Sequence, residues 1–240
     1  MIQFETRLAD VIKRTPDVKS FRFDVREDAE FEAGQFFFVT IRDEGQEITK
    51  HFSFSNSPTE KGYIEFTKRL TGSQYSNALD RLSAGDWAKI KMPYGVFLLE
   101  KKYPKIALLS GGIGITPFRS MCKYATDNNF SNDIVLLYGN NEEKSIIFRK
   151  DFDAIQSENK NFQVIYTLTS PDIDKKSWGG RAGFIDEGMI KEELPDYKER
   201  IFYIAGPPLM VGKLTGMLSG GLGIKKDNIR SENFTGYGDM

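Results

Sequence analysis

The chain has 240 residues, of which 40% are hydrophobic, and its 33 Lys and Arg against 34 Asp and Glu leave a formal net charge of −1. At about 150 residues per domain, this length accommodates one or two domains. The charge balance argues against a protein dedicated to nucleic acid, because phosphate contacts leave a basic surplus. With one cysteine, Cys122, and one histidine, His51, the chain lacks the ligands for a protein-held iron–sulfur cluster or a multi-histidine zinc site, so no metal is expected.

The first hundred residues show short alternating runs, such as 21–25 and 64–66, separated by Gly, Pro, Asp and Asn. Alternation of this kind is typical of antiparallel strands with one solvated face. Residues 75–82 alone in this half have helical spacing. The pattern predicts an antiparallel β-barrel domain over residues 1–102.

From residue 103 onward the pattern changes to continuous apolar runs that alternate with amphipathic segments. Strands are expected at 106–109, 134–138, 164–168 and 201–205, and helices at 116–128, 148–158, 186–194 and 208–218. Such alternation predicts a doubly wound α/β domain with a parallel sheet over residues 103–240.

The chain shows no apolar run of about 20 residues, so we expect no membrane span. Residues 1–7 lack a basic segment followed by an apolar run, and we therefore expect no signal peptide and a cytoplasmic location.

Two glycine-rich turns each follow a predicted strand and precede a predicted helix: SGGIGITPF at 110–118 and AGPPLM at 205–210. The free NH groups and the dipole of a helix start attract an anion, and the first turn predicts a dinucleotide pyrophosphate there. Both turns are expected at the carboxyl ends of strands, where ligands collect. For the first turn, the alternative is a tight strand-to-helix turn that binds no ligand. For the second turn, the alternative is a helix that simply starts at a proline.

The segment KHFSFSNSP at 50–58 places polar and aromatic side chains on opposite faces of a strand. One face carries His51, Ser53 and Ser55, and the other carries Lys50, Phe52 and Phe54. Hydroxyls next to aromatic rings suit a flat heteroaromatic ligand. The alternative is a strand with a solvated serine face.

Taken together and in this order, the segments resemble the ferredoxin-NADP reductase superfamily of flavoproteins. Residues 50–53 are similar to its R-x-Y-S segment, and residues 111–117 are similar to its G-G-x-G-x-x-P turn. Residues 34–36 match its G-Q-[FY] strand start, and residues 205–207 match its C-G-P turn, with Ala205 in place of the cysteine.

On the flavin side, the resemblance implies that the Ser53 hydroxyl bonds the isoalloxazine edge beside the hydride-accepting nitrogen and that Phe52 packs on the flavin. Lys50 stands where relatives have an arginine that binds the flavin phosphate. Lysine keeps the positive charge but cannot form the bidentate hydrogen bonds of a guanidinium, so phosphate binding should be looser. The pyrophosphate elements favour FAD over FMN; the cofactor-binding residues implied here are Lys50, His51, Phe52, Ser53, Lys68, Gly72 and Ser76.

On the nucleotide side, the resemblance implies that Gly112, Gly114 and Thr116 cradle the nicotinamide dinucleotide and that Gly206 and Pro207 border its ring. Near the C-terminus, the resemblance implies that Glu232 is a second catalytic residue, in addition to Ser53, and that Phe234 approaches the flavin face. The alternative for residues 231–234 is an ordinary edge strand.

The resemblance also bears on the nucleotide, because relatives that bind NADPH usually place basic side chains on its 2′-phosphate after the third strand of this domain. Here residues 169–174 include two aspartates and no arginine, so the resemblance favours NADH over NADPH. Lys175, Lys176 and Arg181 follow and leave NADPH open.

These features predict an NAD(P)H-dependent flavoprotein reductase, in which hydride passes from NAD(P)H to FAD. Electrons then leave for a separate acceptor: ferredoxin, a flavodoxin, an oxygenase component or a small molecule. The alternative is a non-catalytic flavin- or nucleotide-binding redox sensor or regulatory subunit, which Ala205 and Lys50 keep open.

Overall fold

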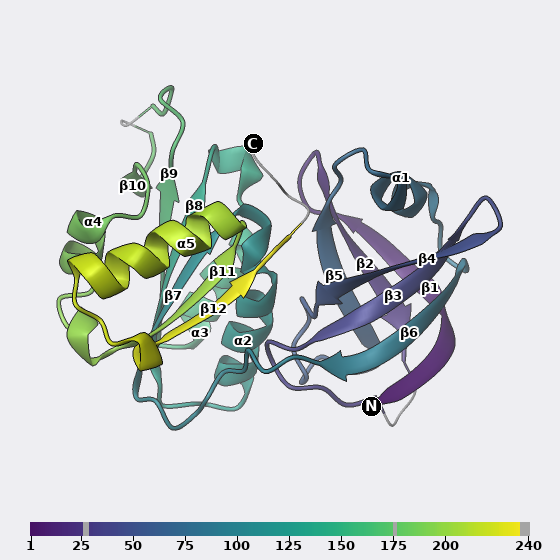
Figure 1. Ribbon diagram of the computed structural model, residues 1–240, viewed down its shortest axis with the longest axis horizontal. Helices are drawn as coiled ribbons and strands as arrows, with labels where there is room; N and C mark the ends of the chain where they lie inside the picture. The colour runs from purple at the N-terminus through teal and green to yellow at the C-terminus, as the bar shows by residue number, and fades with distance from the viewer. Residues whose placement is uncertain (26–28, 175–176, 236–240) are drawn as a thin grey trace. The chain divides into compact units, whose positions relative to one another are not determined.

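The computed structural model describes residues 1–25, 29–174 and 177–235, and these residues form two compact units (Figure 1). The first unit comprises Met1–Leu99 and Thr116–Tyr124. The second comprises Glu100–Ile115 and the described residues from Ala125 onward. Within the described ranges, no helix has both the length and the apolar character that crossing a bilayer requires.

The first unit is a curled six-stranded sheet in which every paired strand is antiparallel, so the predicted antiparallel barrel is confirmed. The strand order is β4-β3-β6-β1-β2-β5. The strands are β1 (Ile2–Lys13), β2 (Val18–Asp24), β3 (Phe36–Asp43), β4 (Gln46–Ser53), β5 (Tyr63–Arg69) and β6 (Trp87–Tyr94).

Alternation along these strands sends one set of side chains into a core rich in phenylalanine. Phe21, Phe23 and Phe66 are fully buried, and Phe66 stacks on Phe21 with ring centroids 5.2 Å apart. Helix α1 (Gln74–Arg81) begins one residue earlier than predicted, because the Ser73 side chain caps it.

The second unit is a six-stranded sheet of order β10-β9-β8-β7-β11-β12. All its pairings are parallel, which confirms the predicted parallel α/β sheet. Its strands are β7 (Lys105–Gly111), β8 (Asp133–Asn140), β9 (Phe162–Leu168), β10 (Arg181–Ala182), β11 (Ile201–Gly206) and β12 (Ile229–Asn233).

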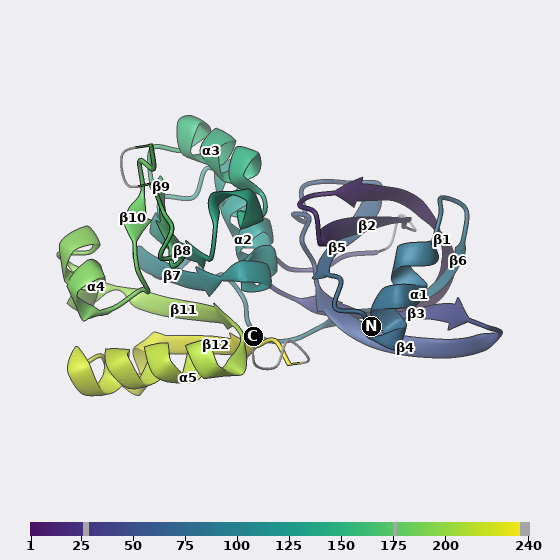
Figure 2. The same ribbon diagram turned by 90° about the horizontal axis from the view of Figure 1, so that it is seen from above.

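Helices cover both faces of this sheet, as Figure 2 shows. On one face, α3 (Arg149–Glu158) packs Phe152 against Tyr138. On the other, α4 (Glu187–Glu193) and α5 (Pro208–Gly216) join an aliphatic core with strand side chains such as Leu137. A π-helical turn, Met217–Gly221, extends α5; the other short turns are Gly112–Ile115, Glu143–Ser145, Tyr197–Glu199 and Lys226–Asn228.

Helix α2 (Thr116–Asp127) follows the first glycine-rich turn directly, and most of it belongs to the first unit. There the Phe118 ring lies 6.0 Å from that of Phe97. The Cys122 thiol is buried, and burial raises its pKa, which agrees with an inert core thiol.

Candidate functional site

The end of β4 carries the serines that the sequence singles out. Ser53 is the last residue of the strand, pairs with Phe36 of β3 and is 7% exposed. Ser55 follows the strand and is fully buried. The hydroxyls therefore lie inside the first unit, and the alternative of a solvated serine face is wrong.

The two faces of β4 separate Phe52 from His51. The Phe52 ring stacks on Phe66 at 4.2 Å and joins the edge of the core. The His51 ring lies instead beside Phe36 and Phe38, with centroids 5.3 and 5.7 Å away. The structure therefore does not bring the His51 side chain to Phe52, and its assignment to a cofactor stays a prediction.

Lys50 and Lys68 bring two positive charges together from β4 and β5. Lys68 is 7% exposed. Burial, together with the nearby Lys50 charge, lowers the pKa of the Lys68 ammonium to about 8. An anion would relieve both the desolvation and the repulsion, so this donor set fits the phosphate groups of a dinucleotide.

The start of α1 carries the other residues predicted to bind the flavin pyrophosphate, Gly72 and Ser76. Gly72 has φ of +71°, a conformation that favours glycine. The Ser73 hydroxyl accepts from the Ser76 backbone NH at 3.4 Å, and the buried Ser76 hydroxyl accepts from the Thr71 NH at 3.2 Å. The cap role of Ser73 was missed in the sequence, although a serine just before a helical pattern is the usual signal.

The two glycine-rich turns of the second unit meet at the carboxyl ends of β7 and β11, as predicted. A Cβ on Gly114 would lie 2.2 Å from the Ala205 carbonyl oxygen and 2.5 Å from the Gly206 Cα, so only glycine fits. Gly112 has φ of +53°, and its carbonyl accepts from the Tyr138 hydroxyl at 2.9 Å.

Both turns also start helices. Thr116, which is 1% exposed, is the first residue of α2, and Pro208 is the first residue of α5, with Pro207 in the cap position. The proline-started helix is therefore present, and it places the first-turn NH groups of α5 next to Gly206.

Glu232 lies next to the second turn, because β12 pairs in parallel with β11 and sets Glu232 opposite Ala205. The Phe234 NH donates to the Gly206 carbonyl at 2.9 Å. The Oε2 atom of Glu232 is buried without a hydrogen-bond partner among the described residues. Burial raises the pKa of this carboxyl to about 7.

The loop after β9 bears on the nucleotide preference. The Ser170 hydroxyl accepts from the Asp172 NH at 3.2 Å and so closes a local turn. Arg181 forms an ion pair with Glu193 at 3.2 Å. The lysines at 175 and 176 lie outside the described residues.

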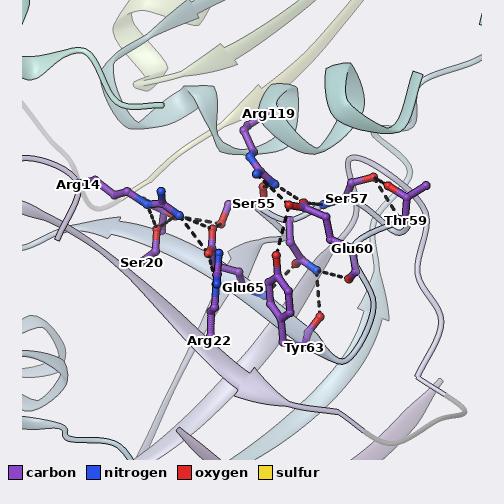
Figure 3. A network of polar contacts seen from close by, with 12 residues as sticks. Arg14, Ser20, Arg22, Ser55, Ser57, Thr59, Glu60, Tyr63, Glu65 and Arg119 are labelled. Carbon is purple, nitrogen blue, oxygen red and sulfur yellow. Dashed lines mark hydrogen bonds and ion pairs between the residues drawn. The ribbon is translucent and has the colours of Figure 1, made fainter. Parts of the chain in front are cut away.

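A polar network that includes Ser55, two residues after Ser53, was missed in the sequence (Figure 3). Its signals were charged residues inside apolar segments, such as Glu65 in β5 and Arg119 in α2. Besides these two, the network includes Arg14, Ser20, Arg22, Ser55, Asn56, Ser57, Thr59, Glu60, Tyr63 and Thr67.

Two family models match the two parts of the chain. An oxidoreductase FAD-binding domain matches residues 5–98, and an oxidoreductase NAD-binding domain matches residues 108–215. Together they cover most of the sequence.

Curated relatives belong to reductase systems. The reductase component of glycine betaine monooxygenase from Chromohalobacter salexigens is 29% identical over 206 residues, which is 84% of this chain and 56% of that protein. A component of the Na⁺-translocating NADH-quinone reductase from Pseudoalteromonas atlantica is 29% identical over 238 residues, covering 91% of this chain and 57% of that protein. The chain thus spans little more than half the length of these relatives.

Solved structures share the fold over nearly the whole chain. A cytochrome P450 reductase from Amycolatopsis has a TM-score of 0.84 at 22% identity, covering 97% of this chain and 70% of that one. A ferredoxin NADP⁺ reductase from Neisseria gonorrhoeae, with bound FAD and NADP, has a TM-score of 0.81 at 20% identity, covering 96% and 98%. With its FAD-binding barrel followed by an NAD-binding α/β domain, the chain belongs to the ferredoxin-NADP reductase superfamily.

Proposed function

We propose that this chain is the NAD(P)H-oxidising flavoprotein reductase of an electron-transfer system, with the flavin domain at residues 1–102 and the nucleotide domain at residues 103–240. The observation that carries the proposal is the pair Lys50 and Lys68. The Lys68 ammonium is buried and lies near the charge of the exposed Lys50, so this pair of cations suits an anion. The diphosphate of FAD supplies such an anion in a chain with an FAD-binding domain.

In this proposal, Lys50 and Lys68 hold the diphosphate together with the turn at Gly72 and the NH groups that begin α1. Phe52 offers a ring surface for packing, and the Ser53 hydroxyl orients the flavin edge. Bound FAD supplies the redox chemistry, because it takes two electrons from a nicotinamide and releases them one or two at a time.

In the proposed nucleotide domain, the nicotinamide dinucleotide is assigned to Gly112, Gly114 and Thr116, with Gly206 and Pro207 at its ring. The glycine turns offer backbone NH groups at helix starts, which suits a pyrophosphate. Glu232 is proposed to supply a carboxyl group whose Oε2 has no hydrogen-bond partner among the described residues, and Phe234 lies one residue beyond the paired strand. Ala205 brings no thiol to this turn, so the proposal includes no cysteine-assisted step.

NADH is the proposed electron donor, since the Ser170 hydroxyl is engaged in its own turn and two aspartates follow it. The proposed acceptor is a separate redox protein, such as the oxygenase component that a monooxygenase reductase implies for its own system. A cytoplasmic location is part of this proposal and rests on the composition, with its single cysteine.

The test is the visible spectrum of the protein reconstituted with FAD and mixed anaerobically with NADH or NADPH. We expect the flavin band near about 450 nm to bleach, and to bleach at lower concentrations of NADH than of NADPH. If the flavin stays oxidised with both nucleotides, the proposed reductase activity is overturned, and a non-catalytic binding module that senses redox state is favoured.

A further inference from the structure

The barrel closes immediately after Ser53. The Phe54 NH donates to the Gln35 carbonyl at 3.0 Å, on the β3 side. One residue later, the Ser55 NH donates to the Glu65 carbonyl of β5 at 2.8 Å. Within two residues the chain therefore passes from one edge of the sheet to the other, and Ser53 stands at the start of this crossing.

Side chains continue the pairing with β5 after the crossing. The Glu65 NH donates to the Asn56 Oδ1 at 2.8 Å, and the Asn56 Nδ2 donates to the Tyr63 carbonyl at 3.0 Å. The Asn56 amide thus takes the place of a backbone unit in the ladder. The Ser55 hydroxyl donates to the Glu65 carboxylate at 2.8 Å, which fixes the crossing from a second side.

The Glu65 carboxylate is itself held firmly. It is 1% exposed, and it accepts from Arg14 at 3.1 Å and from Arg22 at 2.8 Å. Because a buried carboxylate without partners would be costly, these two guanidinium groups hold it in place. The NH and side chain of Ser55 are therefore both satisfied within the barrel.

The remaining group is the Ser55 carbonyl, and Arg119 of α2 reaches it. Figure 3 shows Arg119 directed from the helix toward Ser55 and Glu60. Its Nη1 donates to the Ser55 carbonyl at 3.1 Å, and its Nη2 donates to the Glu60 Oε1 at 3.0 Å. Arg119 is 6% exposed, and its Nη1 also contacts the Glu60 carboxylate.

A buried pair of this kind is a poor source of stability, because desolvation offsets most of the attraction. It does fix geometry, since the planar guanidinium engages the carbonyl and the carboxylate at the same time. The helix that carries Arg119 starts directly after the Gly112–Ile115 turn. The contact therefore ties the segment that follows Ser53 to that helix.

We propose that Arg119, oriented by Glu60, is a positioning residue for Ser53: it holds the Ser55 carbonyl and with it the crossing on which the Ser53 hydroxyl depends. This inference rests on the proposed function, because it concerns the alignment of Ser53 during electron transfer. Arg119 acts through the backbone and is assigned no contact with either cofactor.

The test compares Arg119→Gln, Arg119→Lys and Glu60→Gln with the control Arg7→Gln. Arg7 is a matched control because its Nη1 likewise donates to a backbone carbonyl, that of Gly85, at 2.9 Å, in an exposed setting. Hydrogen exchange of the Phe54 and Ser55 amides in the flavin-free protein is the first measurement. We expect at least tenfold faster exchange in Arg119→Gln and Glu60→Gln, and wild-type exchange in Arg7→Gln.

The second measurement is the rate constant of flavin reduction at saturating NADH, together with the Kd for FAD. In Arg119→Gln, we expect the rate constant of flavin reduction to fall at least tenfold while the Kd for FAD changes less than threefold. Ser53→Ala is added alone and in combination with Arg119→Gln. If Arg119 acts through Ser53, the double variant loses clearly less than the product of the two single losses.

The positioning role is overturned if the losses in the rate constant of flavin reduction caused by Ser53→Ala and Arg119→Gln multiply in the double variant. It is also overturned if Arg119→Gln lowers the melting temperature but reduces flavin at the wild-type rate, because the ion pair is then merely structural. Arg119→Lys and Glu60→Gln keep the test decisive if Arg119→Gln does not fold, since each removes one part of the contact. Absence of flavin reduction in the wild-type protein, by contrast, overturns the proposed function itself.

Discussion

Gly114 and Gly206 lie so close that a Cβ on Gly114 would be 2.5 Å from the Gly206 Cα. This contact joins the turn after β7 to the turn after β11, at the ligand-binding edge of a parallel sheet. The Ala205 carbonyl oxygen would lie 2.2 Å from the same Cβ, so the contact leaves no room for a side chain at position 114.

Gly114→Ala is therefore expected to separate the turns. Overpacking of this kind costs about 1–3 kcal/mol, and the melting temperature should fall by roughly 2–10 °C. The KM for NADH should rise at least tenfold. Gly212→Ala is the control: it lies within α5, where a Cβ meets nothing within 4 Å, so the helix should be unchanged or more stable. A Gly114→Ala protein with wild-type melting and KM would contradict the tight contact.

Lys68 makes FAD binding dependent on pH. The pKa of Lys68 is lowered from 10.5 to about 8 by burial and by the charge of Lys50. The diphosphate prefers the ammonium form, so affinity should fall by up to about tenfold as pH rises from 7.5 to 9, with one proton linked to binding. Fluorescence titration of the flavin-free protein with FAD measures this.

Lys50→Gln should move that fall to higher pH, because it removes the repelling charge. Lys68→Gln should bind FAD more weakly at pH 7.5 and show no such fall. The control Lys19→Gln, which removes a partly exposed ammonium paired with Asp80, should behave as wild type. An affinity for FAD that stays constant over this range in the wild-type protein argues against Lys68 as a phosphate ligand.

Glu232 should make stability depend on pH in the opposite sense to an ordinary ion-paired carboxylate. Burial raises its pKa from 4.5 to about 7, so the folded state holds the proton more tightly than the unfolded state does. The resulting stabilisation is present below pH 4.5 and is lost as pH rises through 7, by roughly 3 kcal/mol in all.

Melting temperatures between pH 5 and pH 8 test this for the wild type, Glu232→Gln and the exposed control Glu158→Gln. The difference between the wild type and Glu232→Gln should shrink or reverse toward pH 8 in favour of the glutamine, whose amide carries no charge to desolvate. Parallel pH curves for these two proteins would show that the Glu232 carboxyl is not desolvated.

Local patterns were sufficient for the fold class. Alternation at 21–25 reflects a strand with one buried face, whereas the run at 106–109 reflects a strand buried on both. At 64–66 the expected solvated face was wrong, because Glu65 is as buried as Ile64 and Phe66. The glycine turn at 110–118 was also visible, because a strand, a glycine cluster and a helix follow one another without interruption. Each of these signals depends only on neighbours in the sequence.

Contacts between distant residues were not predictable in this way. The sequence placed His51 and Ser53 on one face of a strand, but only the barrel showed that Ser53 is buried at a closing crossing while His51 lies among outer aromatic rings. The pairing of Arg119 with Glu60 was equally hidden, since 59 positions separate the two residues.

The sequence alone determined the class of each domain and the chemistry of its turns, because backbone periodicity and glycine placement act over a few residues. Only the tertiary structure decided which charges lie close together and which of them are buried. The proximity of Lys68 to Lys50, and the lack of a partner for the Glu232 Oε2 among the described residues, arise when strand pairing removes side chains from water. Desolvation depends on everything that surrounds a group, and no local pattern records it.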